Sequence, residues 1–350
     1  MAKGPSKRNA DTSLAVRAAW LHYAGGITQA EVARRLRVSN ATASRLIASA
    51  HDIGAVKVSI VGDVAECLGL GDDLCGRFGL KACEVVPDLN EDGLPLRALG
   101  HAGAIFLERT VQSGGEMLIG LGHGRTLAAA IDMMSRIEGG TVRFVSLLGG
   151  VTRNYAANPH DVMFRLAQKT GVESYILPVP FFANTAQDRD VLLAQRGVRH
   201  VYDLALAADI MIVGIGTAEP DAQLVSSRMI EQHEIEEVRR AGGVGELLGH
   251  FFDAGGNPIR TSLEGRTVSP DLKHLKDRRV IAIAGGPEKI DAIAAVLNSG
   301  TISELIIDEP TARDLIRKKV RKPPVGLTGS TASAGSEEDR RTNNERAVHG

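Results

Sequence analysis

Short aliphatic runs alternate with stretches of helical periodicity from about residue 63 onward, and this alternation constrains the fold more than any other feature of the sequence. Runs of this length are typical of fully buried strands, and parallel strands need helical connections across the faces of their sheet. The sequence therefore predicts an α/β domain with a mainly parallel sheet. The predicted strands are 117–121, 142–148, 174–179, 210–215, 280–284 and 304–308, and the predicted intervening helices include 126–137, 161–170 and 287–297.

The 350-residue chain changes in composition along its length. We predict disorder for residues 1–10, a helix-turn-helix domain over 11–60, an effector-binding domain over 61–318 and a disordered tail over 319–350. Residues 1–60 hold nine Lys and Arg against three Asp and Glu, a net charge of +6, and since the whole chain carries −1, the rest carries −7. A small basic segment on a larger acidic body indicates a module that binds polyanions, joined to a domain of another kind.

The cysteines and the apolar runs bear on location and cofactors. Cys67, Cys75 and Cys83 lack the spacing of a zinc site or of a disulfide framework, so we expect reduced thiols, as in a cytosolic protein. No apolar run approaches the roughly 20 residues of a membrane span, and the first residues lack the apolar stretch of a signal peptide. We therefore expect a cytoplasmic protein without a metal, a cofactor or a membrane contact.

The basic segment contains the pattern of a helix-turn-helix. Thr28 and Glu31 form a capping box, and Ser39 is a natural N-cap for a third helix from Asn40 to about Ala50. In this motif the last helix enters the major groove of DNA. The alternative is a protein-interaction module with a solvated polar face, but the +6 charge favours phosphate contacts. The residues that we expect to face DNA are Thr28, Gln29, Ser39, Asn40, Thr42, Ser44 and Arg45.

Three glycine-containing loops, 120–126, 216–217 and 284–289, follow predicted strands. Each could be only a tight turn, but loops at the carboxyl ends of parallel strands converge where α/β proteins bind ligands. A helix N-terminus beside such a loop favours an anion. Asp253, next to another glycine turn, either binds ligand hydroxyl groups or caps its own turn. The candidate effector residues in the loops are Gly122, Gly124, Arg125, Thr126, Gly216, Thr217 and Lys289.

Taken in order, the motifs resemble the SorC family of bacterial sugar-responsive transcriptional regulators. The matching segments are 21–33, 42–47, 120–126, 147–150, 157–158, 165–167, 213–217, 251–253 and 284–289. The resemblance implies an effector domain folded like glucosamine-6-phosphate deaminase and ribose-5-phosphate isomerase. It implies an anion-binding loop at Gly124, Arg125 and Thr126, and pocket residues at Asn158, Asp253 and Lys289. His123 stands where the family often has Trp, and Gly255 replaces a frequent acidic or amide residue.

Two classes of function remain open at this point. The first is a regulator whose binding to double-stranded operator DNA is controlled by a sugar, a sugar phosphate or a polyol, in a homodimer or homotetramer. The second is a sugar-phosphate isomerase or deaminase, since a fold does not fix a function. Such an enzyme needs a positioned base and acid, and Asp253 has no evident second partner. The basic segment favours the regulator, in which we expect no catalytic residue.

Overall fold

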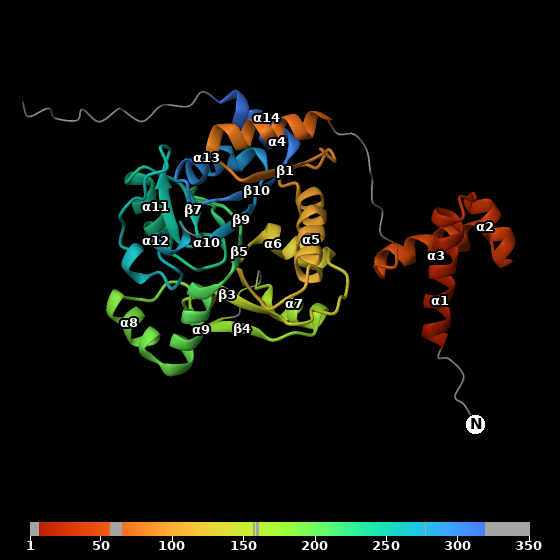
Figure 1. Cartoon of the computed structure of the whole chain (residues 1–350), viewed down its shortest axis with the longest axis horizontal. Coiled ribbons are helices and arrows are strands. Elements are labelled where there is room, and N and C mark those ends of the chain that lie inside the picture. The colour runs from red at the N-terminus through yellow and green to blue at the C-terminus, as the bar shows by residue number, and fades with distance from the viewer. Residues whose placement is uncertain (1–6, 57–64, 157, 159–160, 277, 319–350) are drawn as a thin grey trace, which may run out of the picture. The chain divides into compact units, whose positions relative to one another are not determined.

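The structure is a computed structural model that describes residues 7–56, 65–156, 158, 161–276 and 278–318 (Figure 1). Residues 1–6 and the tail over 319–350, for which the sequence predicts disorder, lie outside the described residues. Residues 57–60, at the end of the predicted helix-turn-helix domain, also lie outside them.

The N-terminal domain consists of α1 (Lys7–Ala19), a π-helical turn η1 (Trp20–Ala24), α2 (Gln29–Leu36) and α3 (Asn40–Asp52). The buried residues at its centre are Ala18, Val32, Ala33, Ala43 and Ile47. α1 begins at Lys7, within the segment 1–10 for which the sequence predicts disorder. The segment from Lys7 to Ala19 has no glycine or proline, so nothing in the backbone stops the helix from extending one turn further.

Two of the predicted helix caps are confirmed. The Thr28 hydroxyl oxygen accepts from the backbone N–H of Glu31 at 3.3 Å, and the Ser39 hydroxyl oxygen accepts from that of Thr42 at 3.1 Å. The second half of the capping box is not found among the described residues, because the Glu31 carboxylate pairs with Arg34 and with Arg35, the latter at 3.8 Å. The tight turn between α2 and α3 passes through Arg37 in the left-handed conformation.

The second domain is built on a seven-stranded parallel sheet in the order β1-β10-β9-β5-β2-β3-β4. Its strands are β1 (Ala82–Val86), β2 (Met117–Leu121), β3 (Val142–Val151), β4 (Ser174–Pro180), β5 (Ile210–Val213), β9 (Arg279–Ile283) and β10 (Glu304–Asp308). The longer helices are α4 (Ala65–Phe78), α5 (Leu96–Gln112), α6 (Arg125–Met133), α7 (Met163–Thr170), α8 (Ala186–Ala194), α9 (Arg196–Ala207), α11 (Gln232–Arg240), α13 (Ile290–Asn298) and α14 (Glu309–Arg317). Shorter turns are α10 (Gln223–Ser226), η2 (Glu264–Arg266), α12 (Leu272–Leu275) and η3 (Pro287–Lys289).

Helices cover both faces of this sheet, as the sequence predicts (Figure 1). In β5, Ile210 and Ile212 pack with α5, α6 and α7, while Met211 and Val213 pack with α4, α13 and α14 on the other face. This alternation follows from the two-residue period of a strand. A strand buried on both faces must be apolar at every position, which is why these strands appear as continuous apolar runs.

A second, antiparallel sheet was not predicted. It consists of β6 (Gly216–Thr217), β7 (Gly243–Leu247) and β8 (His250–Asp253). Its register places Gly216 opposite Glu246, so the loop that follows β5 is joined to a strand about thirty residues later. This pairing brings side chains of β7 to the carboxyl end of the parallel sheet.

Candidate functional site

A cavity of about 390 Å³ lies at the carboxyl ends of β2, β5 and β9, which are neighbours in the sheet. The three predicted glycine loops meet there, as the topology of a parallel sheet requires. Of the predicted effector residues, the lining includes Gly122, Gly124, Arg125, Thr126, Gly216, Thr217 and Lys289. It also includes His123, Leu148, Glu219, Asp221, Gln223, Leu224, Glu246, Leu248 and Glu288.

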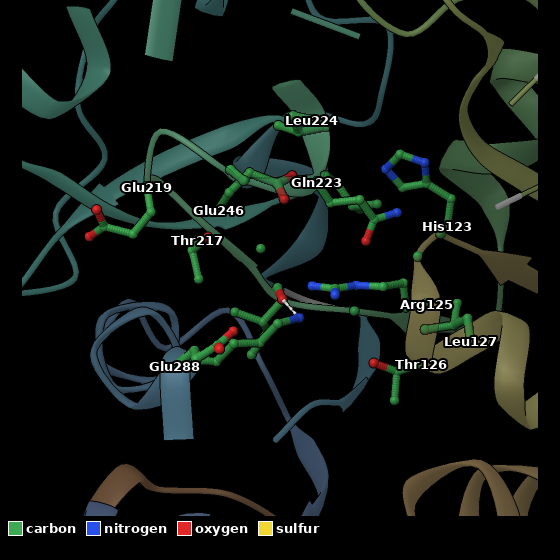
Figure 2. Close-up of a pocket in the computed structure, with 18 of the residues that line it drawn as sticks. His123, Arg125, Thr126, Leu127, Thr217, Glu219, Gln223, Leu224, Glu246 and Glu288 are labelled. Carbon is green, nitrogen blue, oxygen red and sulfur yellow. Dashed lines mark hydrogen bonds between the residues drawn. The ribbon is translucent and has the colours of Figure 1, made fainter. Parts of the chain in front are cut away.

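The N-terminus of α6 forms one side of the cavity. Gly124, at φ 129°, precedes the helix in a conformation that side-chain-bearing residues rarely adopt, and its carbonyl accepts from the Ala128 N–H at 2.9 Å. Thr126 is buried, whereas the Arg125 guanidinium reaches into the cavity (Figure 2). The first backbone N–H groups of a helix have no partner within the helix, so this side offers donors to a ligand oxygen.

Lys289 crosslinks two of the loops. Its Nζ donates to the backbone carbonyl of Ile215 at 2.7 Å, and the residue is only 9% exposed. Burial, together with the nearby charge of Arg125, lowers the pKa of Lys289 to about 8, although the Glu246 carboxylate acts in the opposite direction. Lys289 therefore lies in the wall of the cavity and holds the loop after β5.

Glu246 is a lining residue that sequence reasoning missed. Its Oε1 accepts from the Gly249 N–H at 2.5 Å, and the residue is 7% exposed. Burial raises the pKa of this carboxyl to about 7, against the effects of the Gly249 hydrogen bond and the Lys289 charge. The signal that could have found it is a lone carboxylate in the run Gly243–Leu247, since a buried charged residue needs a reason to be there.

Gln223 is a second residue that was missed. It begins α10, and its side chain lies in the cavity wall near His123 (Figure 2). Its Nε2 is buried and has no hydrogen-bond partner among the described residues. An unsatisfied buried donor is costly, so this amide is a candidate donor to a ligand oxygen.

Asn158 acts on the cavity through His123. It is buried beside a small neighbouring pocket, and its Nδ2 lies 2.9 Å from Nδ1 of His123, whose ring packs edge-on against Phe181. Asn158 thus contacts a residue of the main cavity without lining it, and its predicted contact with the effector stays a prediction.

Asp253 is not among the residues that line the cavity, so the effector role predicted for it stays a prediction. Its Oδ1 accepts from the backbone N–H groups of Gly255 and Asn257, both at 2.9 Å, and the Asn257 side chain donates to its Oδ2 at 3.1 Å. Of the two readings that the sequence left open, the turn cap is the one observed. The physical reason is local, because an aspartate before a glycine turn satisfies the N–H groups that the turn exposes.

The N-terminal domain presents the residues expected to face DNA. Thr28, Gln29, Ser39, Asn40, Ser44 and Arg45 are exposed, and Thr42 is half-buried beside Ser39, with their hydroxyl oxygens 2.8 Å apart. Ala43 and Ile47 face the domain core, so the polar face of α3 is directed outward. The arrangement leaves one helix with amide, hydroxyl and guanidinium groups that can reach base edges or phosphates.

Comparison with known proteins relates the chain to one group of regulators. The family described as "Putative sugar-binding domain" matches residues 62–317. The "Erythritol catabolism regulatory protein EryD" of Brucella abortus is 56% identical over 88% of this chain and 98% of its own length. The "Transcriptional regulator LsrR" of Klebsiella pneumoniae is 33% identical over 88% of this chain and 94% of its own. The full-length sorbitol operon regulator SorC from Klebsiella pneumoniae superposes with a TM-score of 0.63 at 26% identity, covering 88% of this chain and 99% of that one.

The chain belongs to the SorC family of sugar-binding transcriptional regulators. As a SorC-family member it is a DNA-binding regulator whose operator binding is controlled by a small carbohydrate effector. Its relatives are regulators and not enzymes, so the isomerase or deaminase alternative has no support. Among the described residues, no helix combines the length and the apolar character that crossing a bilayer requires.

Proposed function

We propose that this regulator controls the catabolism of a small polyol of the erythritol class, and that this polyol or an early product of it is the effector. The observation that carries the proposal is the 56% identity, over nearly the whole length of the relative, to a regulator named for erythritol catabolism. The polar lining of the cavity supports it, since a polyol needs a hydrogen-bond partner for each hydroxyl group that it buries.

In this proposal the effector binds in the cavity at the carboxyl ends of β2, β5 and β9. Its oxygens accept from the first N–H groups of α6, from Arg125 and from Gln223, and its hydroxyl groups donate to Glu246. The glycines lining the cavity allow the backbone to approach it closely. The residues proposed to contact the effector are Gly122, Gly124, Arg125, Thr126, Gly216, Thr217, Gln223 and Glu246.

The proposed operator contacts lie on α3 and at the start of α2. Arg45 binds guanine or a phosphate and Asn40 binds adenine, while the remaining polar residues fix the position of the helix on the backbone. A cytoplasmic homodimer or homotetramer would present two such helices to a two-fold operator. Light scattering of the purified full-length chain tests the assembly, and a monomer at operator-binding concentrations would contradict it.

The effector assignment is tested by operator release. Genomic fragments selected by the purified protein supply the operator, and fluorescence anisotropy follows its binding as erythritol, its phosphates and other four- to six-carbon polyols are added. We expect one member of the erythritol class to shift the binding midpoint. The Gln223→Ala variant should blunt this shift, whereas the matched control Gln232→Ala, at an exposed position on α11, should not. No shift with any erythritol compound would refute the proposal.

A further inference from the structure

The charges on the cavity wall are unequal. The described lining residues include four carboxylates and two cationic side chains, namely Glu219, Asp221, Glu246 and Glu288 against Arg125 and Lys289. In Figure 2 the Arg125 side chain enters from one side, and Glu219 and Glu288 lie at the other. The wall therefore has an excess of negative groups, which disfavours a ligand that carries negative charge.

Lys289 and Arg125 differ in how freely their positive charges can contact a ligand in the cavity. The Lys289 ammonium is buried and already donates to the Ile215 carbonyl at 2.7 Å. Arg125 has no ion pair among the described residues, so its guanidinium is the cationic group offered to a ligand. Glu219 contacts Arg239 at 3.5 Å, but both side chains are about half exposed and such pairs contribute little.

A phosphate monoester does not fit this balance. It carries a charge of about −1.5 to −2 near neutral pH. Arg125, the Lys289 ammonium and the N-terminus of α6 would favour it, while Asp221, Glu288 and the ionised form of Glu246 would repel it. The phosphate would also need its hydration replaced by donors, whereas four of the lining side chains are carboxyl groups.

The pattern of donors and acceptors matches hydroxyl groups instead. The Glu246 Oε2 lies so close to the backbone of Gly216 that a Cβ at that position would collide with it, which places an acceptor on the cavity side. Gln223 Nε2 offers a buried donor without a partner among the described residues. A hydroxyl group can donate to the first and accept from the second, whereas a phosphate oxygen can only accept.

Building on the proposed function, we infer that the effector is an uncharged polyhydroxylated compound and that the carboxylates of the cavity exclude its phosphorylated form. Its hydroxyl groups donate to Glu246 and accept from Gln223 and Arg125. The regulator would then respond to the unmodified compound and not to the product of a phosphorylating enzyme.

The test compares an uncharged compound with its own phosphate. Calorimetric titration of the full-length protein uses erythritol against erythritol 4-phosphate, and ribitol against ribitol 5-phosphate, each at low and at high salt. We expect the uncharged member of at least one pair to bind about tenfold or more tightly than its phosphate, with an affinity that salt does not change. The difference in affinity between the two members of that pair should become smaller at high salt, because screening weakens the repulsion between the phosphate and the carboxylates of the cavity.

A charge variant separates electrostatics from shape. Glu288→Gln removes one carboxylate with little change in volume, so it should reduce the preference for the uncharged member several-fold. Glu236→Gln makes the same chemical change on the exposed face of α11, away from the cavity lining, and should leave the preference unchanged.

Three results would overturn the inference. They are tighter binding of the phosphate, no binding of either uncharged compound, and an unchanged preference in Glu288→Gln. The operator-release experiment is independent of this comparison. If erythritol binds more tightly than its phosphate but no erythritol compound changes operator affinity, the proposed function fails while the inference about ligand charge stands. If only a phosphate releases the operator, the proposed function stands and the inference fails.

Discussion

The Lys289 ammonium donates to the backbone carbonyl of Ile215 at 2.7 Å, and this bond joins the loop after β9 to the loop after β5. Ile215 is itself buried, so its carbonyl depends on this donor in place of water. A cation that the sequence suggests as a ligand group is thus part of the structure that shapes the cavity.

Lys289→Met should therefore weaken folding as well as effector binding. The change leaves the Ile215 carbonyl without its donor, and losing one partner of a buried hydrogen bond costs about 1–3 kcal/mol. Denaturant unfolding of the variant measures the loss, with Lys273→Met, at an exposed lysine, as the matched control. Unchanged stability combined with lost effector binding would show that Lys289 contacts the ligand directly.

Glu246→Gln should change how stability depends on pH. The folded-state pKa of Glu246 is raised to about 7 from its ordinary value of 4.5, so the folded protein binds more protons between these values than the unfolded chain does. The stability that the protonated Glu246 contributes is fully present below the unfolded-state pKa of 4.5. It is lost as the pH rises through the folded-state pKa of about 7. Glutamine does not ionise, so the variant should gain up to about 3 kcal/mol relative to the parent at about pH 8, and little at about pH 4.

Unfolding free energies of the parent and the variant at these two pH values give the comparison. Glu236→Gln, at an exposed position, supplies the control for the loss of one carboxylate. An equal difference between parent and variant at both pH values would mean that the Glu246 carboxyl does not titrate in this window.

The parallel sheet could be predicted from the sequence because each strand is a local pattern. The predicted bounds 117–121 and 304–308 are those of β2 and β10, since consecutive apolar residues with flanking turns define a buried strand. The predicted strand 210–215 ends early, at Val213, where the chain turns at Gly214. β1 was missed because this strand, at the edge of the sheet, mixes exposed and buried residues.

The site was only partly predictable because half of its chemistry depends on pairing between distant segments. Gly124, Arg125 and Thr126 follow one strand directly, so a local motif finds them. Glu246 reaches the cavity only through the pairing of β7 with β6, and β7 is too rich in glycine to have a strand pattern. The bond of Lys289 to the Ile215 carbonyl could not be predicted for a similar reason, because that carbonyl lies 74 residues away along the chain.

Arg45→Ala should weaken specific operator binding by about 1–3 kcal/mol, the value of a good base contact, and leave the fold intact. Arg45 is exposed on α3, whose opposite face packs in the domain core. Anisotropy with the operator and with an unrelated duplex gives the specificity ratio. Arg17→Ala removes the same charge from α1 and should reduce binding to both duplexes alike. Equal losses of stability and binding in Arg45→Ala would indicate a structural role.

Removal of residues 1–60 should abolish DNA binding and retain effector binding and assembly. The second domain has its own core on both faces of the sheet, and its sequence carries the acidic excess of the chain. A field of that sign repels phosphate, so the fragment should not bind nucleic acid even at low salt. Calorimetry, light scattering and anisotropy on the fragment test the three parts. A monomeric fragment would place the oligomer contacts in the N-terminal domain.

Gly216→Ala should weaken effector binding without unfolding the protein. Gly216 lies opposite Glu246 in the small sheet, and a Cβ there would collide with the Glu246 carboxylate, which must then move from its place in the cavity wall. Displacing the acceptor should lower the affinity for erythritol by about tenfold, since a lost hydrogen bond to a charged group is worth at least that factor. Calorimetric titration measures the affinity, and circular dichroism confirms that the variant is folded.

Gly197→Ala is the matched control for this substitution. Gly197 lies in α9 with no heavy atom within 4 Å of the added Cβ, so alanine should leave effector binding unchanged and stabilise the helix by about 0.5–1 kcal/mol. Comparable loss of erythritol binding in both variants would show that the effect is not specific to the carboxylate of Glu246. Full affinity in Gly216→Ala would mean that this carboxylate does not contact the effector, and the ligand would then be held by Arg125, Gln223 and the N-terminus of α6 alone.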